Sequence, residues 1–227
     1  MVPIVELKRA SKEYVNGSLR VKALCEIDLR IDPGEYAVIM GASGSGKSTL
    51  GRVVLRLEQP DGGRIVFDGR DITDLSIRDL RSRRADMQMI FQDPVSSLDP
   101  RLPVSEVIAE PLRVWNRGNE VEISAKIDEL LLAANLDPAV VRDRRSYEFS
   151  GGQCQRISIA RSLALDPTMI ICDEPVSALD VSVQAQILNL LQDMKDRYGL
   201  TLMFISHDLA VVKAVSTRVM VMYLGKV

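Results

Sequence analysis

Residues 41–48 read Gly-Ala-Ser-Gly-Ser-Gly-Lys-Ser and match the pattern G-x-x-x-x-G-K-[S/T]. A short apolar run, residues 36–40, precedes this octet, and a helix-compatible segment, residues 47–57, follows it. Glycines let such a turn wrap tightly, so that its N–H groups point inward at phosphate oxygens, and the following helix N-terminus adds partial positive charge. A coincidental glycine-rich turn before a lysine is the alternative, and amino-acid frequencies put it at roughly one chain in a hundred of this length. The stretch therefore predicts a strand–loop–helix unit that binds a nucleotide.

Each position of this loop has an expected contact. The Lys47 ammonium is expected to reach the β- and γ-phosphates, and the Ser48 hydroxyl is expected to bind Mg²⁺. The pattern alone says neither which nucleotide binds nor what its hydrolysis drives. The residues predicted to contact the nucleotide here are Gly41, Ala42, Ser43, Gly44, Ser45, Gly46, Lys47, Ser48 and Thr49.

Two adjacent carboxylates follow a second short apolar run. Residues 169–172 are Met-Ile-Ile-Cys, and Asp173 and Glu174 come directly after them. Ligands of open α/β sheets bind at the carboxyl ends of strands. Asp173 is therefore predicted to hold the Mg²⁺ shell, and Glu174 is predicted to orient and polarise the attacking water. An exposed acidic turn is the alternative, and the phosphate-binding pattern in the same chain disfavours it.

The composition describes an ordinary globular chain of 227 residues, with 46% hydrophobic and 26% charged residues. The net charge of −2 gives no electrostatic reason to expect nucleic acid as a partner. Cys25, Cys154 and Cys172 are too few and too widely spaced for a disulfide framework or a zinc site, which fits a reducing cytoplasm. No signal peptide and no apolar run of membrane-spanning length is found, so any work at a membrane is expected from outside the bilayer.

Strands alternate with helices along most of the chain, which predicts an α/β fold with a largely parallel sheet covered on both faces. The N-terminal third is β-rich. Expected strands cover residues 23–31, 36–40, 64–67, 169–172, 201–205 and 218–223, and expected helices cover 47–57, 123–135, 150–165, 182–198 and 209–214. In the first strand, alternation places one face inward, formed by Ala23, Cys25, Ile27, Leu29 and Ile31. Segment 93–150 does not show this alternation of strands and helices. Prolines at 94, 100, 103 and 111 are expected to break its first part, and the segment is predicted to be an inserted helical subdomain.

A second glycine motif, Phe149-Ser150-Gly151-Gly152-Gln153, precedes Gln155-Arg156-Ile157 and resembles the signature motif of the ABC ATPases, with Phe149 where leucine is more usual. Ser150 followed by Gln153 is also a capping box, so a well-capped helix is the simpler interpretation. The resemblance implies that Ser150 and the N–H groups of Gly151 and Gly152 hold the γ-phosphate of an ATP on an opposing subunit. The neighbouring Cys154 stands where a polar or basic residue is common, which is expected to alter the edge of that subunit interface.

Further residues match other motifs of the ABC ATPases, in the order in which those motifs follow one another along the chain. Tyr14 resembles the aromatic residue that stacks on adenine, although a half-buried strand tyrosine would look the same. Gln92, in Phe-Gln-Asp, resembles the glutamine that touches Mg²⁺ and water. Asp180 ends a Ser-Ala-Leu-Asp run that resembles the D-loop. His207, the only histidine of the chain, resembles the switch histidine that contacts the γ-phosphate, and a structural histidine is the alternative.

The resemblance covers essentially the whole chain and implies a P-loop NTPase fold with a mostly parallel core sheet, an N-terminal antiparallel β subdomain and a helical insertion. It implies one ABC ATPase domain over 1–227, with residues 1–92 and 151–227 forming the nucleotide-binding core and residues 93–150 forming the insertion that ends at the signature motif. ATP with Mg²⁺ is expected to bind between Lys47 of one subunit and Ser150 of the other, and Glu174, His207 and Gln92 are expected to act in hydrolysis.

Four sequence segments narrow the resemblance to importer ATPases for peptides and nickel. They are residues 90–101, 148–153, 176–184 and 204–209. This implies a second ATPase subunit, identical or related, together with membrane permeases and, indirectly, an extracytoplasmic solute-binding protein. The chain is then expected at the cytoplasmic face of the membrane. The alternative is an ABC-type ATPase that acts on nucleic acid or ribosomes, but the interval between the two glycine motifs is short and lacks sustained heptads, and only one phosphate loop is present. Relatives usually continue past the position of Val227.

Overall fold

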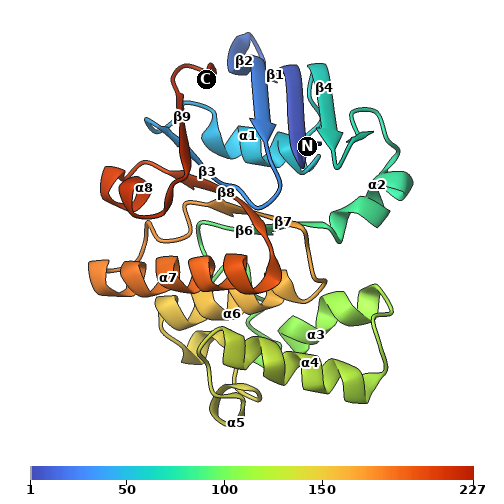
Figure 1. Cartoon of the computed structure of the whole chain (residues 1–227), viewed down its shortest axis with the longest axis vertical. Coiled ribbons are helices and arrows are strands. Elements are labelled where there is room, and N and C mark those ends of the chain that lie inside the picture. The colour runs from blue at the N-terminus through green and yellow to red at the C-terminus, as the bar shows by residue number, and fades with distance from the viewer. Residues whose placement is uncertain (1) are drawn as a thin grey trace.

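Helix α1 (Lys47–Val54) lies between two β-sheets in the computed structural model, which describes residues 2–227 (Figure 1). The first sheet is antiparallel, and its strands in spatial order are β2 (Leu19–Ile31), β1 (Val5–Asn16), β4 (Gly62–Phe67) and β5 (Arg70–Asp71). The second sheet is parallel, and its strands in spatial order are β6 (Met87–Ile90), β7 (Met169–Asp173), β8 (Thr201–Ser206), β3 (Tyr36–Gly41) and β9 (Arg218–Met222). Both sheets bury their facing apolar residues against α1.

The other helices lie below the parallel sheet or at its rim (Figure 1). They are α2 (Ile77–Arg84), α3 (Val104–Val114), α4 (Glu120–Ala133), α5 (Pro138–Val141), α6 (Gly151–Leu163), α7 (Val181–Tyr198) and α8 (Leu209–Val215), with a 3₁₀ turn at Ser146–Glu148. No helix in residues 2–227 combines the length and apolarity that a bilayer span needs.

Alternation along the buried parallel strands creates two separate cores. In β8, Leu202 and Phe204 point into the core shared with α3, α4, α6 and α7. Met203 and Ile205 point the other way, into the core shared with α1 and the antiparallel sheet. Because every residue of β8 is buried, this strand ties the two cores together. The fold class expected from the sequence, an α/β fold with an antiparallel N-terminal sheet and a helical insertion, is confirmed.

The inward face predicted for residues 23–31 is only partly correct. Ile27, Leu29 and Ile31 are buried as expected, but Leu24 is buried instead of its neighbours on either side. The pairing of β1 with β2 shifts register between Ala10 and residue 12, and Glu26 has a φ of 49°. An extra residue in a β-bulge reverses the alternation beyond it.

The expectation that prolines break the first part of segment 93–150 is wrong for Pro111. Helix α3 contains this proline in its last turn and continues to Val114. The helix has strong apolar partners, since Val107, Ile108 and Leu112 are buried. Tertiary packing thus outweighs the loss of one backbone hydrogen bond. The sequence predicted no individual element at strands β1, β5 and β6 or at helices α2, α3 and α5.

Phe204→Ala is predicted to lower the free energy of unfolding by about 3–5 kcal/mol, because it leaves a cavity in a fully buried site. The Phe204 ring lies 5.9 Å from the Tyr36 ring, centroid to centroid, and has no exposed surface. Urea denaturation measures the change. Val181→Ala is the control: Val181 is 82% exposed, so its substitution should change stability by less than about 0.5 kcal/mol. A Phe204 variant as stable as the control would contradict the packing described here.

Candidate functional site

The loop of residues 42–46 connects β3 to α1 at the carboxyl edge of the parallel sheet. Gly44 and Gly46 adopt φ values of 76° and 101°, in the left-handed region that favours glycine. At Gly41 an added Cβ would collide with the Met222 carbonyl, so the chain can run this close to β9 only without a side chain. The loop is braced from outside, because the N–H of Gly225 donates to its Ser45 carbonyl at 3.1 Å.

The Lys47 side chain folds back over this loop. Its ammonium donates to the carbonyls of Gly41 and Ala42 at 2.8 and 2.9 Å, and the residue is only 4% exposed. No carboxylate forms an ion pair with Lys47 within the described part of the chain. A buried cation without an anion is costly. The first N–H groups of α1 also lack helical acceptors, so the loop is built to receive an anion.

Ser48 and Asp173 meet on the same side of the loop. The Ser48 hydroxyl donates to Asp173 Oδ1 at 2.9 Å, although 125 residues separate the two in sequence. Burial raises the pKa of Asp173, while the Ser48 hydroxyl and the guanidinium of Arg52 oppose that shift. A hydroxyl and a buried carboxylate oxygen are ligands that suit Mg²⁺. This pair therefore offers two oxygens for a divalent cation next to the phosphate loop.

Glu174 gathers two partners from other segments. Its Oε2 accepts from Gln92 Nε2 at 3.2 Å and lies 3.2 Å from His207 Nδ1. The residue has a φ of 48°, and its N–H donates to the carbonyl of Ile205 on β8. Non-glycine residues in left-handed conformations are strained and concentrate at functional sites. The strain here turns the carboxylate away from the strand and toward the two side chains that hold it.

Several of these groups line one cleft of about 480 Å³, although Asp173 is not among its lining residues. Tyr14, Lys47, Ser48, Gln92 and Glu174 line it together, with Ser43, Gly44, Gly46 and Thr49. A neighbouring hollow connects Gly41, Ala42 and Ser43 with Glu174 and His207. Ser45 lines neither, and its hydroxyl is buried without a hydrogen-bond partner. The cleft has the size of ordinary small-molecule sites, and its cationic, N–H-rich floor fits a nucleotide triphosphate.

The second glycine motif lines neither hollow. Ser150 caps α6, since its Oγ accepts from Gln153 N at 3.3 Å and Gln153 Oε1 accepts from Ser150 N at 3.0 Å. Asp180 caps α7 in the same way, because its Oδ1 accepts from Val183 N at 3.0 Å. The capping-box interpretation of the signature helix is thus confirmed as a local structure. Ligand contacts of Ser150, Gly151, Gly152, Gln153 and Asp180 stay predictions.

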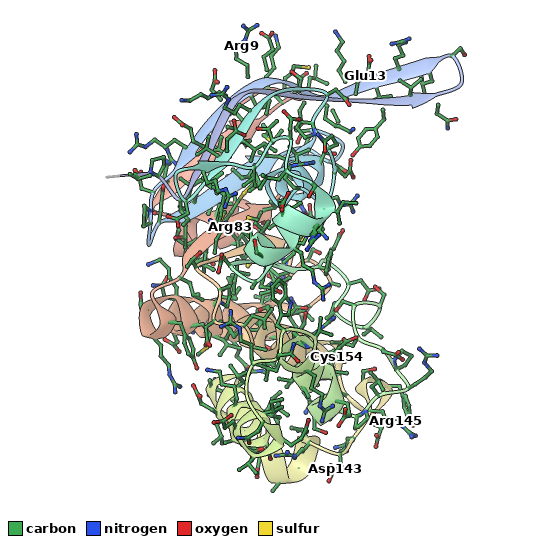
Figure 2. The ribbon with its side chains drawn as sticks, turned by 90° about the vertical axis from the view of Figure 1, so that its right-hand side faces the viewer. Arg9, Glu13, Arg83, Asp143, Arg145 and Cys154 are labelled. Atoms are coloured by element: carbon green, nitrogen blue, oxygen red, sulfur yellow. The ribbon has the colours of Figure 1, made fainter. Side chains whose placement is uncertain are left out.

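Cys154 does not lie at a surface, contrary to the expectation that it alters the edge of an interface. It has no exposed surface, and its thiol donates to the Ser146 carbonyl at 3.3 Å (Figure 2). Position 154 falls on the side of α6 that faces the helical core. Burial raises the pKa of its thiol, so it behaves as a small apolar residue.

The structure also brings residues to the cleft that the sequence did not reveal. Lys22 and Ala23 reach it from β2, because Tyr14 pairs with Val21 across the β1–β2 hairpin. The Tyr14 hydroxyl donates to Glu58, which lies 44 residues away in the turn after α1. No local pattern marks these contacts, since they depend on how the hairpin lies over α1.

Comparison with known proteins agrees with this geometry. A model of the ABC transporter family matches residues 24–177. A peptide import ATP-binding protein of Brucella ovis, provisionally so named, is 47% identical over 225 residues, which span 99% of this chain and 71% of that protein. The oligopeptide transport ATP-binding protein OppF of Salmonella typhimurium is 45% identical over 221 residues, which span 97% of this chain and 66% of OppF.

A solved structure extends the likeness to three dimensions. A dimeric post-hydrolysis state of the ATP-binding cassette MJ0796, bound to ADP and Pi, superimposes with a TM-score of 0.89. The two chains are 33% identical, and the match covers 98% of this chain and 96% of that one. The chain therefore belongs to the ABC transporter family, and it is an ATP-hydrolysing cassette of that family.

Proposed function

We propose that this chain powers the import of peptides through membrane permeases, from the cytoplasmic face of the membrane. The observation that carries the proposal is the single cleft that Lys47, Ser48, Gln92 and Glu174 line together, with Ser48 bonded to Asp173 and Gln92 bonded to Glu174. The names of the Brucella and Salmonella relatives support peptides rather than nickel as cargo. They also give no support to the alternative of action on nucleic acid or ribosomes.

The roles of the site residues follow from where they lie. Lys47 and the N–H groups of its loop bind the β- and γ-phosphates of ATP. Ser48, Asp173 and Gln92 hold Mg²⁺, which when bound supplies positive charge to the terminal phosphoryl oxygens. Glu174 accepts a proton from the attacking water, and the hydrogen bond from Gln92 and the close approach of His207 hold its carboxylate for that task.

A second cassette completes the site, in this proposal. Ser150, Gly151, Gly152 and Gln153 form the exposed start of α6 and lie outside the cleft of their own chain, so their N–H groups suit an ATP held by another copy or a related chain. Asp180, at the start of α7, belongs to the same surface. The dimeric state of the MJ0796 cassette supports such an arrangement. Residues 93–150 then act as an inserted unit of a single domain spanning 1–227.

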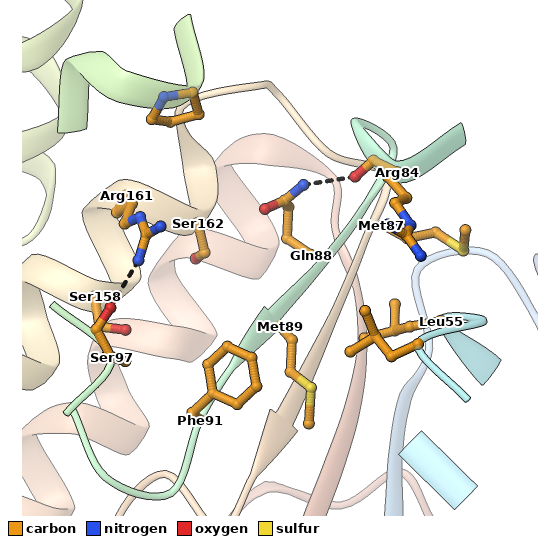
Figure 3. Close-up of a pocket in the computed structure, with 12 residues that line it drawn as sticks. Leu55, Arg84, Met87, Gln88, Met89, Phe91, Ser97, Ser158, Arg161 and Ser162 are labelled. Carbon is orange, nitrogen blue, oxygen red and sulfur yellow. Dashed lines mark hydrogen bonds between the residues drawn. The ribbon is translucent and has the colours of Figure 1, made fainter. Parts of the chain in front are cut away.

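The segment before Gln92 offers a route from the cleft to a permease. A second cavity, of about 240 Å³, lies between the nucleotide-binding core and the helical insertion and is lined by Leu55, Met89, Phe91 and Pro111 among others (Figure 3). Phe91 lines this cavity, and the adjacent Gln92 contacts Glu174. We propose that a permease segment docks in this cavity. A change in the position of Glu174 then reaches the docked segment through Gln92 and Phe91, which are consecutive residues.

Glu174→Gln is predicted to retain ATP binding and to lose most hydrolysis. The amide keeps the shape of the side chain but cannot accept a proton, and removing a positioned base typically costs about 10²–10⁴-fold in rate. Phosphate release at saturating ATP measures turnover, and calorimetry measures binding. Hydrolysis within a fewfold of the wild-type rate would show that another residue is the base.

Ser150→Arg is predicted to leave ATP affinity of the isolated chain within about twofold and to abolish hydrolysis, because its bulk blocks closure on a partner's ATP. The lost helix cap should cost about 1 kcal/mol of stability. Asn119→Ala is the matched control, since it removes the capping box of α4 far from the cleft and should leave hydrolysis unchanged. The assays are ATP affinity, ATPase rate and ATP-dependent association, with the related subunit present if the dimer is mixed. If the folded Ser150→Arg variant still hydrolyses ATP, then Ser150 acts only as a helix cap.

A strain that lacks this chain is predicted to lose uptake of a labelled oligopeptide and to keep nickel uptake. The wild-type chain should restore peptide uptake, whereas Glu174→Gln should not, because transport needs turnover. If the deletion strain takes up the peptide normally although the purified chain hydrolyses ATP, then the transported solute is not this peptide class.

A further inference from the structure

Tyr14 enters the cleft from a part of the chain that is poorly anchored. It lies near the tip of the β1–β2 hairpin, which projects beyond the antiparallel sheet near Glu13 (Figure 2). The last residues of β1 and the first of β2 are exposed, and the Tyr14 side chain is itself 39% exposed. Packing therefore covers this ring only in part, and polar contacts help to hold it over the cleft.

Glu58 is the group that holds the outer end of the ring. The Tyr14 hydroxyl donates to Glu58 Oε2, while Glu58 Oε1 lies 3.6 Å from Nη1 of Arg52 on α1. The N–H of Glu58 also donates to the Arg52 carbonyl at 3.2 Å, which ties its backbone to the end of the helix. Desolvation, followed by the contact with Glu58, raises the pKa of the Tyr14 phenol, while a hydrogen bond with Thr49 on α1 and the charge of Arg52 oppose that shift. Thr49 is therefore a second partner of this hydroxyl.

Asp61, three residues further along, holds the backbone of the hairpin rather than the ring. Its Oδ2 accepts from the N–H of Glu13 at 2.6 Å, and its Oδ1 accepts from Lys12 Nζ at 3.2 Å. Its own N–H donates to the Ser11 carbonyl at 2.8 Å. The Lys12 ammonium lies over the Tyr14 ring, 5.7 Å from its centroid. The turn after α1 thus fixes the strand at Asp61 and the aromatic side chain at Glu58.

The helix that precedes Glu58, α1, begins at Lys47. Its eight residues span about 12 Å, which places the phosphate-binding ammonium at one end and the holder of Tyr14 just beyond the other. Because α1 is packed between two sheets, the separation of these two points is fixed. A ligand with phosphates at Lys47 and an aromatic base some distance away would find the Tyr14 ring already in place.

We propose that Glu58 is a positioning residue for the nucleotide base: its carboxylate holds the Tyr14 ring against α1, so that the ring is ordered before the base stacks on it. The proposal rests on the proposed binding of ATP and on the expectation, from the family resemblance, that Tyr14 stacks on the base. Ordering a free side chain on binding weakens affinity, by an amount that corresponds to about three- to tenfold in Kd. Glu58 removes that loss for ligands that have a base and does nothing for phosphates alone.

The test compares ADP with inorganic pyrophosphate, since neither is hydrolysed by this site and only ADP has a base. Glu58→Ala should weaken ADP binding about three- to tenfold and leave pyrophosphate binding unchanged, as measured by calorimetry with Mg²⁺. Tyr14→Phe keeps the ring and loses the hydroxyl with both of its partners, so it should weaken ADP binding at least as much as Glu58→Ala, and the double variant should be no weaker than Tyr14→Phe. Glu58→Gln retains an acceptor oxygen and should bind ADP within about twofold of wild type.

Glu13→Ala is the matched control, because Glu13 lies on the same hairpin and its side chain contacts only Arg20 within the part of the chain that the structure describes. It should bind both ligands as wild type does. Unchanged ADP affinity in Glu58→Ala would overturn the proposal. So would an equal loss for pyrophosphate, which would mean that Glu58 supports the phosphate loop, or additive losses in the double variant.

Tyr14→Ala separates this inference from the function on which it rests. If Tyr14→Ala weakens ADP binding more than Tyr14→Phe while Glu58→Ala has no effect, Tyr14 carries the base and only the role of Glu58 is wrong. If Tyr14→Ala leaves ADP affinity unchanged, Tyr14 does not carry the base, and the assignment of Tyr14 fails together with the role of Glu58.

Discussion

The buried ammonium of Lys47 depends on two carbonyl oxygens of its own loop, and much of the structure serves to keep those oxygens in place. The carbonyl dipoles of Gly41 and Ala42 compensate only part of a full charge removed from water. Their positions require the left-handed glycines of the loop, the pairing of β3 with β8 and β9, and the burial of α1 between two sheets. An anionic ligand therefore completes an arrangement that the fold leaves electrostatically incomplete.

Local sequence was enough to predict the parts of the site that consecutive residues build. The glycine octet, the Asp173–Glu174 pair after a buried strand and the Ser150–Gln153 cap each lie within a few residues, and each is found where it was expected. Their spacing carries the geometry, because one strand end or one helix start sets all the atoms involved. The fold class followed from the same alternation of strands and helices.

Other features could not be predicted, because they are decided by segments that are distant in sequence. The bulge at Glu26 depends on the partner strand β1, and it moves Leu24 into the core. Pro111 stays inside α3 because the other side of that helix is buried by α4 and α6. Glu58 reaches Tyr14 only because the hairpin crosses the end of α1. The roles of Gln92, His207 and Asp180 came from family resemblance rather than from local physics.

The contacts that support the phosphate loop from β9 and Gly225 have a consequence for folding during translation. Gly225 donates to Ser45 and accepts from the N–H of Cys25, and β9 pairs with β3 along the strand that leads into the loop. These partners are synthesised long after the loop itself has left the ribosome. During translation the phosphate loop therefore lacks these contacts, and the nascent chain acquires its full nucleotide pocket only when residues 218–225 emerge and dock. Bound nucleotide then favours the state in which these residues have docked, because a ligand stabilises only the state that binds it.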